Sequence, residues 1–153
     1  MGKICTFFGH RKTYLDDEEK ENICNKVIEL IENEDVDTFL FGGYGMFDSA
    51  CAGIVRRLQK KYPHITTHLL LPYPKRASKY ATAFYEEYDF DMVSYFDPDM
   101  LIYPRYTISK RNDYMAKTCD FMICYVIFSW GGAHRAMQKA IRSKKQVFNF
   151  APL

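Results

Sequence analysis

The hydrophobic positions of this chain fall into six short runs separated by amphipathic stretches, a pattern that predicts strands alternating with helices. The runs are apolar throughout rather than alternating with polar residues, which is typical of strands buried on both faces of a sheet. The predicted strands are Lys3–Phe8, Thr38–Phe41, Ile65–Leu71, Met100–Tyr103, Phe121–Phe128 and Gln146–Phe150.

Most of the intervals between these runs carry apolar residues at helical spacing. The predicted helices cover about Asp16–Asn33, Ala50–Lys60, Ile108–Lys117 and Ala133–Ile141. The interval from Lys75 to Asp91 is more polar and is compatible with a helix over a flap. The sequence leaves open whether Tyr73–Asp91 closes over a ligand.

This alternation predicts an α/β fold, a Rossmann-like three-layer sandwich with a mostly parallel sheet. A length of 153 residues without repeats or linkers favours a single domain over residues 1–153. In such sheets, ligands bind outside the carboxyl ends of the strands, at a topological switch point. We expect three segments to share that edge: Gly9–Lys12, Gly42–Asp48 and Ser129–Arg135.

A glycine turn follows the second predicted strand. Gly42 and Gly43 come directly after Phe41, Gly45 follows Tyr44, and a helical pattern then begins. A strand, a glycine turn and a helix place free backbone N–H groups and the positive end of a helix dipole together, which favours an anion such as phosphate. A tight turn that binds nothing is the alternative, since the spacing is not the full G-x-G-x-x-G fingerprint.

A second strand, glycine turn and helix occur near the C-terminus, where Gly131 and Gly132 are followed by His134 and Arg135. The same argument predicts an anion site there. Arg11, directly after the first strand, is a further candidate phosphate ligand. His10 beside it either caps the site or packs against the protein.

Three cations lie within Arg105–Arg111, just before the buried strand that starts at Phe121. Arg111 and Asn112 are candidates to present a fork of donors to a phosphate and an amide to a ribose or base. A solvated helix face is the other interpretation of this charged run.

Asp48, early in the second helix, either complements the helix dipole or acts on a bound sugar, as a ligand for its hydroxyls or as an acid or base. Tyr44, Tyr73 and Trp130 are available for base stacking.

Composition narrows the class of partner. The formal net charge of +2 is too small to argue for nucleic acid or an anionic membrane surface. No apolar run approaches the roughly 18 residues of a membrane span, and the N-terminus lacks the apolar core of a signal peptide. The five cysteines are scattered without C-x-x-C pairs and are interpreted as reduced, buried side chains of a cytoplasmic protein. No metal site and no cofactor is predicted.

Four motifs, in order along nearly the whole chain, resemble those of the short YpsA-like members of the SLOG superfamily. They are Cys-Thr-Phe-Phe-Gly-His-Arg at Cys5–Arg11, Phe-Gly-Gly-Tyr-Gly-Met-Phe-Asp at Phe41–Asp48, Lys-Arg-Asn-Asp-Tyr-Met at Lys110–Met115 and Gly-Gly-Ala at Gly131–Ala133. The Leu-Pro-Tyr of Leu71–Tyr73 also falls where that group carries it.

The resemblance implies a Rossmann-like fold related to the LOG phosphoribohydrolases and the DprA family, with a nucleotide or nucleotide-derived ligand. Carried over by position, Gly42, Gly43, Gly45 and Asp48 match the first glycine motif, Gly131 and Gly132 the second, and Arg111 with Asn112 the Arg-Asn motif.

One departure bears on activity. LOG enzymes carry Pro-Gly-Gly-x-Gly-Thr followed by a catalytic glutamate, whereas Trp130-Gly131-Gly132-Ala133-His134-Arg135 stands here and the nearest counterparts of the glutamate are Met137 and Gln138. Neither side chain ionises, so neither acts as a base or stabilises an oxocarbenium-like transition state.

Two main hypotheses follow. The first is a binding module, a sensor or sequestering protein for a nucleotide-type small molecule. The second is an enzyme acting at the N-glycosidic bond of a nucleotide, LOG-like or deoxyribosyltransferase-like, with Asp48 as the tentative catalytic residue. Nucleic-acid binding by analogy with DprA is disfavoured by the near-neutral charge. A homodimer or higher homo-oligomer fits the aromatic content.

The ligand-binding residues predicted at this stage are Gly9, His10, Arg11, Gly42, Gly43, Tyr44, Gly45, Arg111, Asn112, Trp130, Gly131, Gly132, Ala133 and His134.

Overall fold

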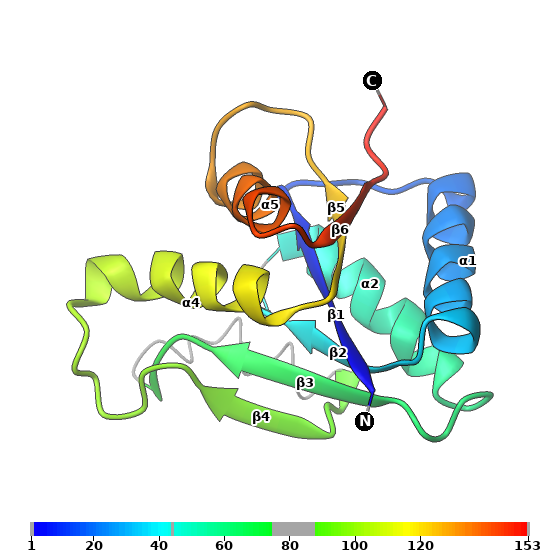
Figure 1. Cartoon of the computed structure of the whole chain (residues 1–153), viewed down its shortest axis with the longest axis horizontal. Helices are drawn as coiled ribbons and strands as arrows, with labels where there is room; N and C mark the ends of the chain where they lie inside the picture. The colour runs from blue at the N-terminus through cyan, green and yellow to red at the C-terminus, as the bar shows by residue number, and fades with distance from the viewer. Residues whose placement is uncertain (1, 44, 75–87, 153) are drawn as a thin grey trace.

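The computed structural model of the chain describes residues 2–43, 45–74 and 88–152. Six strands form one sheet in the order β4-β3-β2-β1-β5-β6, and every neighbouring pair is parallel (Figure 1). The strands are β1 (Lys3–Gly9), β2 (Val36–Phe41), β3 (Thr66–Leu71), β4 (Met92–Tyr95), β5 (Phe121–Tyr125) and β6 (Gln146–Asn149). The helices among the described residues are α1 (Asp17–Asn33), α2 (Gly45–Leu58), α4 (Pro104–Thr118) and α5 (Gly132–Arg142).

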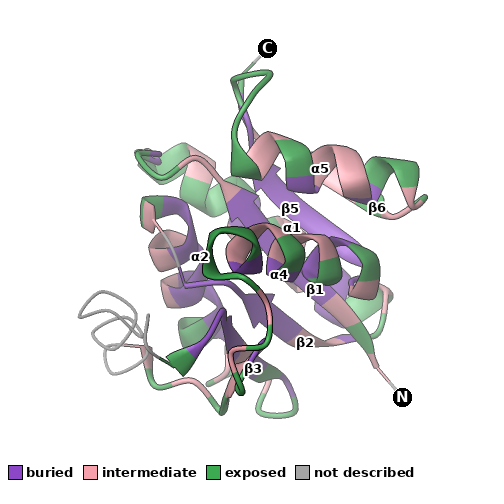
Figure 2. Cartoon of the chain, turned by 90° about the vertical axis from the view of Figure 1, so that its left-hand side faces the viewer, coloured by how far each residue is buried: buried purple, intermediate pink, exposed green. Residues whose placement is uncertain are grey.

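Two apolar cores lie on opposite faces of the sheet. Phe39 and Phe41 of β2 pack with buried residues of α1 and α2, whereas the intervening Leu40 packs with residues of α4 and α5. Because successive side chains of a strand point to opposite faces, one apolar strand serves both cores. Figure 2 shows the strands buried between the helices. The predicted α/β class and three-layer arrangement are confirmed.

The order of the strands reverses at β1. The chain adds β2, β3 and β4 on one side of β1 and then crosses to place β5 and β6 on the other. The segments that follow β1 and β5 therefore diverge into helices on different faces of the sheet, which leaves a crevice outside the carboxyl ends of these two strands.

The predicted strand at Met100–Tyr103 is wrong, and the edge strand is Met92–Tyr95, paired with β3 from His68↔Met92 to Leu71↔Tyr95. The Asp97 carboxylate accepts the N–H groups of Leu101 and Ile102 at 3.0 and 2.9 Å, and Met100 has φ +56°. These side-chain bonds hold the apolar segment in a turn, so its N–H groups do not join the sheet.

Other strand and helix boundaries differ from the predicted ones by a few residues. β5 ends at Tyr125 rather than Phe128 because the side-chain amide of Asn149 exchanges two hydrogen bonds of 3.0 Å with the Val126 backbone and closes the ladder. α4 begins at Pro104, where the missing N–H of proline costs the helix nothing. Most of the predicted flap, residues 75–87, lies outside the described residues.

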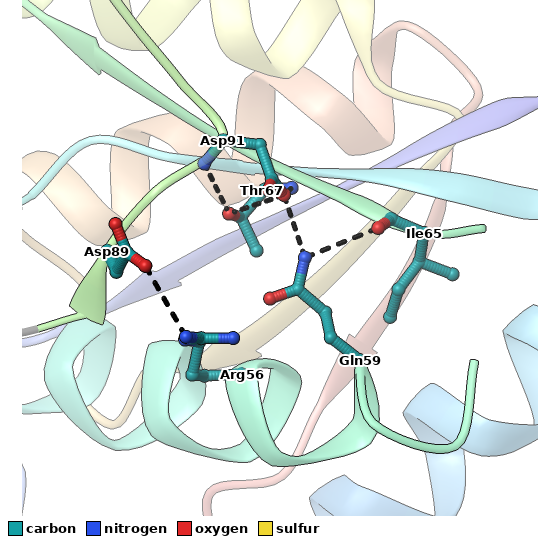
Figure 3. Close-up of polar contacts among 6 residues, drawn as sticks. All are labelled: Arg56, Gln59, Ile65, Thr67, Asp89 and Asp91. Atoms are coloured by element: carbon teal, nitrogen blue, oxygen red, sulfur yellow. Dashed lines mark hydrogen bonds and ion pairs between the residues drawn. The ribbon is translucent and has the colours of Figure 1, made fainter. Parts of the chain in front are cut away.

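A polar network fastens the opposite, amino-terminal edge of the sheet (Figure 3). The Asp91 carboxylate accepts from the Thr67 N–H at 2.8 Å and from Gln59 Nε2 at 2.7 Å, and Gln59 also donates to the Ile65 carbonyl. Burial alone would raise the pKa of Asp91, but these hydrogen bonds lower it overall. The network joins the end of α2 to the starts of β3 and β4.

Gly45, the first residue of α2, lies tightly against the segment after β1. Its φ is +89°, and a Cβ built on it would lie 2.9 Å from the Arg11 Cα. The N–H of the next residue, Met46, donates to the Arg11 carbonyl at 3.0 Å. Glycine is needed here both for the backbone conformation and for this close approach.

We expect Gly45→Ala to lower the free energy of unfolding by about 2–4 kcal/mol, because an unfavourable φ is combined with a backbone clash. Gly131 is the matched control: its φ is +93°, but a Cβ there meets nothing within 4 Å. Gly131→Ala should therefore carry the backbone strain alone, about 1–3 kcal/mol, and cost less than Gly45→Ala. Urea unfolding of both variants measures the difference, and equal losses would mean that the contact with Arg11 contributes nothing.

Candidate functional site

A cavity of about 340 Å³ lies at the β1/β5 switch point. Its wall combines the segment after β1, the turn after β2, one side of α4 and the beginning of α5. The lining residues are Phe8, Gly9, His10, Arg11, Gly42, Asp48, Ile108, Arg111, Asn112, Gly131, Gly132 and Ala133. Most of the residues predicted from the sequence are thus brought together. Of the others, Gly43, Gly45, Trp130 and His134 do not line it, and Tyr44 lies outside the described residues.

The turn before α5 presents open backbone donors. Gly131 is the N-cap and offers no side-chain cap, and the Arg135 N–H makes the first bond of the helix, to the Gly131 carbonyl at 3.0 Å. The N–H groups of Gly132, Ala133 and His134 have no hydrogen-bond partner among the described residues. Together with the helix dipole, these donors favour an anion.

The turn after β2 differs from the expectation of free N–H groups. The Gly43 N–H donates to Asp48 Oδ2 at 3.0 Å, and the Met46 N–H is taken by the Arg11 carbonyl. Asp48 is 6% exposed, so its carboxylate is a buried anion belonging to the protein itself. The two glycine turns are therefore unequal: the described donors of the first are satisfied internally, and those of the second are open.

Arg111 joins three elements. Its side chain is 3% exposed, and Nη1 donates to the carbonyl of Gly42 at 2.9 Å and to that of Leu70 at 3.3 Å. Nε and Nη2 donate to Asn112 Oδ1 at 3.3 and 3.0 Å. The guanidinium thus ties the ends of β2 and β3 to α4, a structural role that the sequence did not indicate.

Asn112 is oriented by this contact. Because its Oδ1 accepts from Arg111, its Nδ2 is the free end of the amide, and it has no partner among the described residues. A Cβ built on Gly132 would lie 3.7 Å from Nδ2, so this donor stands beside the open turn of α5.

His10 holds the segment that follows β5. Its Nε2 accepts the N–H groups of Ile127 at 2.8 Å and Phe128 at 3.2 Å, so the ring is neutral with its proton on Nδ1. Burial lowers the pKa of His10, and the charge of His134 lowers it further. Of the two roles left open by the sequence, packing describes these contacts: the imidazole also lies against the Phe128 ring, with centroids 4.8 Å apart.

The aromatic residues continue away from the cavity. Phe128 stacks on Trp130 with centroids 4.5 Å apart, and the two side chains are 45% and 65% exposed. Trp130, considered above for base stacking, therefore belongs to an exposed row of aromatic rings that begins beside His10.

The cysteines are free and lack an activated setting. Cys5, Cys51, Cys119 and Cys124 are buried and Cys24 is half-buried. Burial raises the pKa of each thiol, that of Cys119 to about 11. In the described part of the chain, no group of three or more His, Cys, Asp and Glu side chains is placed to hold a metal ion. Over the same residues, no helix combines the length and apolar character that a membrane crossing requires.

A somewhat larger cavity, about 400 Å³, lies between α4 and the sheet. Its polar wall includes His68 and Ser94, whose Nε2 and Oγ are 2.6 Å apart, and burial lowers the pKa of His68. No Asp, Glu, Lys or Arg lines it among the described residues, so it offers no fixed positive charge to an anionic ligand.

Solved structures with the same architecture were found. DprA from Streptococcus pneumoniae superposes with a TM-score of 0.64 at 18% identity, over 97% of this chain and 50% of that one. The Moco Carrier Protein from Chlamydomonas reinhardtii gives 0.56 at 19% identity, over 99% of this chain and 78% of that one. TM1055, a structural-genomics target, superposes with a TM-score of 0.55 at 14% identity, over 95% of this chain and 72% of that one.

The chain shares the fold of these proteins. One of them is a DprA protein, the family to which the motif resemblance pointed, so the Rossmann-like fold expected from the motifs is confirmed. Membership of the SLOG superfamily and of its YpsA-like branch stays a prediction, because at these identities the likeness concerns the fold alone. The chain spans half the length of DprA. No protein-family model and no curated protein matches the sequence.

The His10 contact predicts a pH dependence. The pKa of His10 in the folded protein lies below its ordinary value of 6.5, so the folded state binds fewer protons than the unfolded chain. The resulting stabilisation is present above that value and is lost as the pH falls through the lowered pKa. Between about pH 7.5 and about pH 5, the wild-type protein should therefore lose more stability than His10→Gln.

The glutamine side chain keeps a carbonyl acceptor for the loop but does not titrate. Because His68, His134 and the carboxylates are present in both proteins, the difference between the two pH curves, measured by urea unfolding, isolates His10. Parallel curves would show that its titration is not linked to folding.

Arg111→Met should lower the free energy of unfolding by at least about 2 kcal/mol, because buried carbonyl groups lose a charged donor. The adjacent Lys110 is exposed, and Lys110→Met, the matched control, should change stability by no more than about 0.5 kcal/mol. Chemical denaturation followed by circular dichroism measures both losses of stability. Comparable losses would contradict the role of Arg111 in joining β2 and β3 to α4.

Proposed function

We propose that this protein binds a nucleotide or a nucleotide-derived small molecule at the switch-point cavity, with a phosphate on the N–H groups of Gly132, Ala133 and His134. The observation that supports this most directly is that these donors have no partner among the described residues, and that Gly132 and Ala133 line a cavity of about 340 Å³. That volume falls within the range of about 300–1,000 Å³ typical of small-molecule pockets.

The sugar of the ligand is assigned to the opposite side of the cavity. The Asp48 carboxylate lies there, and a carboxylate repels phosphate but accepts hydrogen bonds from hydroxyl groups. The Nδ2 of Asn112, between Asp48 and the α5 turn in this proposal, donates to the ring oxygen or to a phosphate oxygen. The ligand is thereby oriented with its sugar toward α2 and its phosphate toward α5.

Binding without turnover is favoured over catalysis. Met137 and Gln138 stand where LOG enzymes carry their glutamate, and neither ionises. The name of the Moco Carrier Protein describes a protein that carries a small molecule, which supports the same class of function on this fold. Processing at the N-glycosidic bond is the alternative, because Asp48 is the carboxylate that lines the cavity among the described residues.

The decisive test changes Gly132. A Cβ fits there, 3.7 Å from Asn112 Nδ2, so Gly132→Ala should fold normally. Gly132→Asp places a carboxylate on the open N–H groups and excludes an external anion. The interaction of this carboxylate with the helix dipole should stabilise the folded protein by about 0.3–1 kcal/mol. Thermal-shift screening of nucleotides, ADP-ribose, NAD and cyclic nucleotides identifies a ligand, and calorimetry should then show affinity weakened at least about tenfold in Gly132→Asp and largely kept in Gly132→Ala.

Chromatography after incubation separates the two functions. A ligand recovered intact supports the binding module, whereas release of free base supports processing. A ligand that binds Gly132→Asp as tightly as the wild-type protein would refute the assignment of phosphate to the α5 turn. Gly132 is preferred to Arg111 for this test, because loss of the hydrogen bonds from Arg111 to β2 and β3 would disturb the fold together with the site.

A further inference from the structure

A second, smaller cavity adjoins the switch-point cavity. It has a volume of about 230 Å³ and lies between α4 and α5. The two cavities share Ile108, Asn112 and Gly132, so a ligand on the open turn of α5 lies at the entrance to both. The remaining lining residues of the smaller one are Arg105, Ser109, Asp113, Arg135 and Ala136.

Two arginines give this second cavity its charge. Arg105 comes from the first turn of α4 and Arg135 from the first turn of α5, and both are exposed. Neither forms an ion pair among the described residues, not even with Asp113 on the same wall. The Arg105 guanidinium lies 5.4 Å from the centre of the Tyr106 ring, a contact that supports its planar group.

The spacing along α5 places the second charge close to the open N–H groups. Arg135 follows Gly132 by one helical turn, which corresponds to about 4–5 Å along the axis. Because helical side chains lean toward the N-terminus, the Arg135 side chain extends back toward Gly132. An anion bound in the second cavity would therefore be an immediate neighbour of one bound on the turn.

We infer that the cavity between α4 and α5 is a second anion subsite and that the natural ligand carries two adjacent phosphates, as a nucleoside diphosphate does. This inference rests on the proposed function. The sugar lies near Asp48, the first phosphate on the N–H groups of the α5 turn, and the second phosphate between Arg105 and Arg135. A guanidinium offers paired donors to phosphate oxygens, which suits this position.

Inorganic phosphate and pyrophosphate test the inference without requiring the correct base. Calorimetric titrations at constant ionic strength compare the wild-type protein with Arg105→Gln, Arg135→Gln and the double variant. Arg142→Gln is the matched control, since it removes the same charge from the exposed last turn of α5. We expect pyrophosphate to bind at least about tenfold more tightly than phosphate, and this ratio to fall below about threefold in the double variant but not in Arg142→Gln.

The outcomes separate the two proposals. Equal affinities for phosphate and pyrophosphate, or a ratio that Arg142→Gln reduces as much as the double variant does, would overturn the second subsite and leave the proposed function standing. Failure of both anions to bind would overturn the second subsite, whereas the proposed function is overturned by the absence of any ligand in the nucleotide screen. Adenosine 5′-monophosphate and 5′-diphosphate form a second pair, and the same dependence on Arg105 and Arg135 is expected of their ratio.

Discussion

Polar backbone groups at the carboxyl edge of a parallel sheet must find partners once the strands end, and the organisation of this protein follows from that requirement. Arg111 satisfies the carbonyls of Gly42 and Leu70, where β2 and β3 stop. His10 accepts two N–H groups of the segment after β5. The Asp48 carboxylate accepts the Gly43 N–H after β2. Each of these side chains satisfies backbone groups at the edge that would otherwise be open to a ligand.

The α5 turn is the exception to this closure. Its cap residue is glycine, which brings no side-chain acceptor, and the donors behind it have no partner among the described residues. A buried helix end left this way would be destabilising, but here Gly132 and Ala133 line a cavity, where water or a ligand supplies the acceptor. The beginning of α1 differs, because Asp16 and Glu19 form a reciprocal capping box there. The protein's own carboxylates thus occupy the position that an external anion would take.

The sequence predicted the fold class and most residues of the cavity, because both depend on local patterns. Apolar runs and glycine turns are visible without knowledge of tertiary contacts, and parallel strands bring their carboxyl ends to one edge. The failures arose where a side chain bonded to backbone groups, a contact that the apolar pattern does not record. Asp97 converted an apolar run into a turn, and the roles of Arg111 and His10 depend on carbonyl and N–H groups far along the chain. The Arg-Asn motif by itself does not reveal which of its atoms are already hydrogen-bonded.

The arrangement of charges across the paired cavities gives them a direction. Asp48 is on one side, the dipole of α5 stands in the middle, and Arg105 and Arg135 line the far end. Arg111 also lines the larger cavity, but its guanidinium donates to backbone carbonyls and to Asn112. The α5 turn, Arg105 and Arg135 therefore favour the phosphates of the proposed ligand at their end, and Asp48 favours its hydroxyl groups. Arg11 and Arg111 are the arginines that line the larger cavity, and Arg11 is the exposed one of the two. Its carbonyl accepts the Met46 N–H of α2, and its side chain has no partner among the described residues, which leaves the guanidinium available to an entering anion.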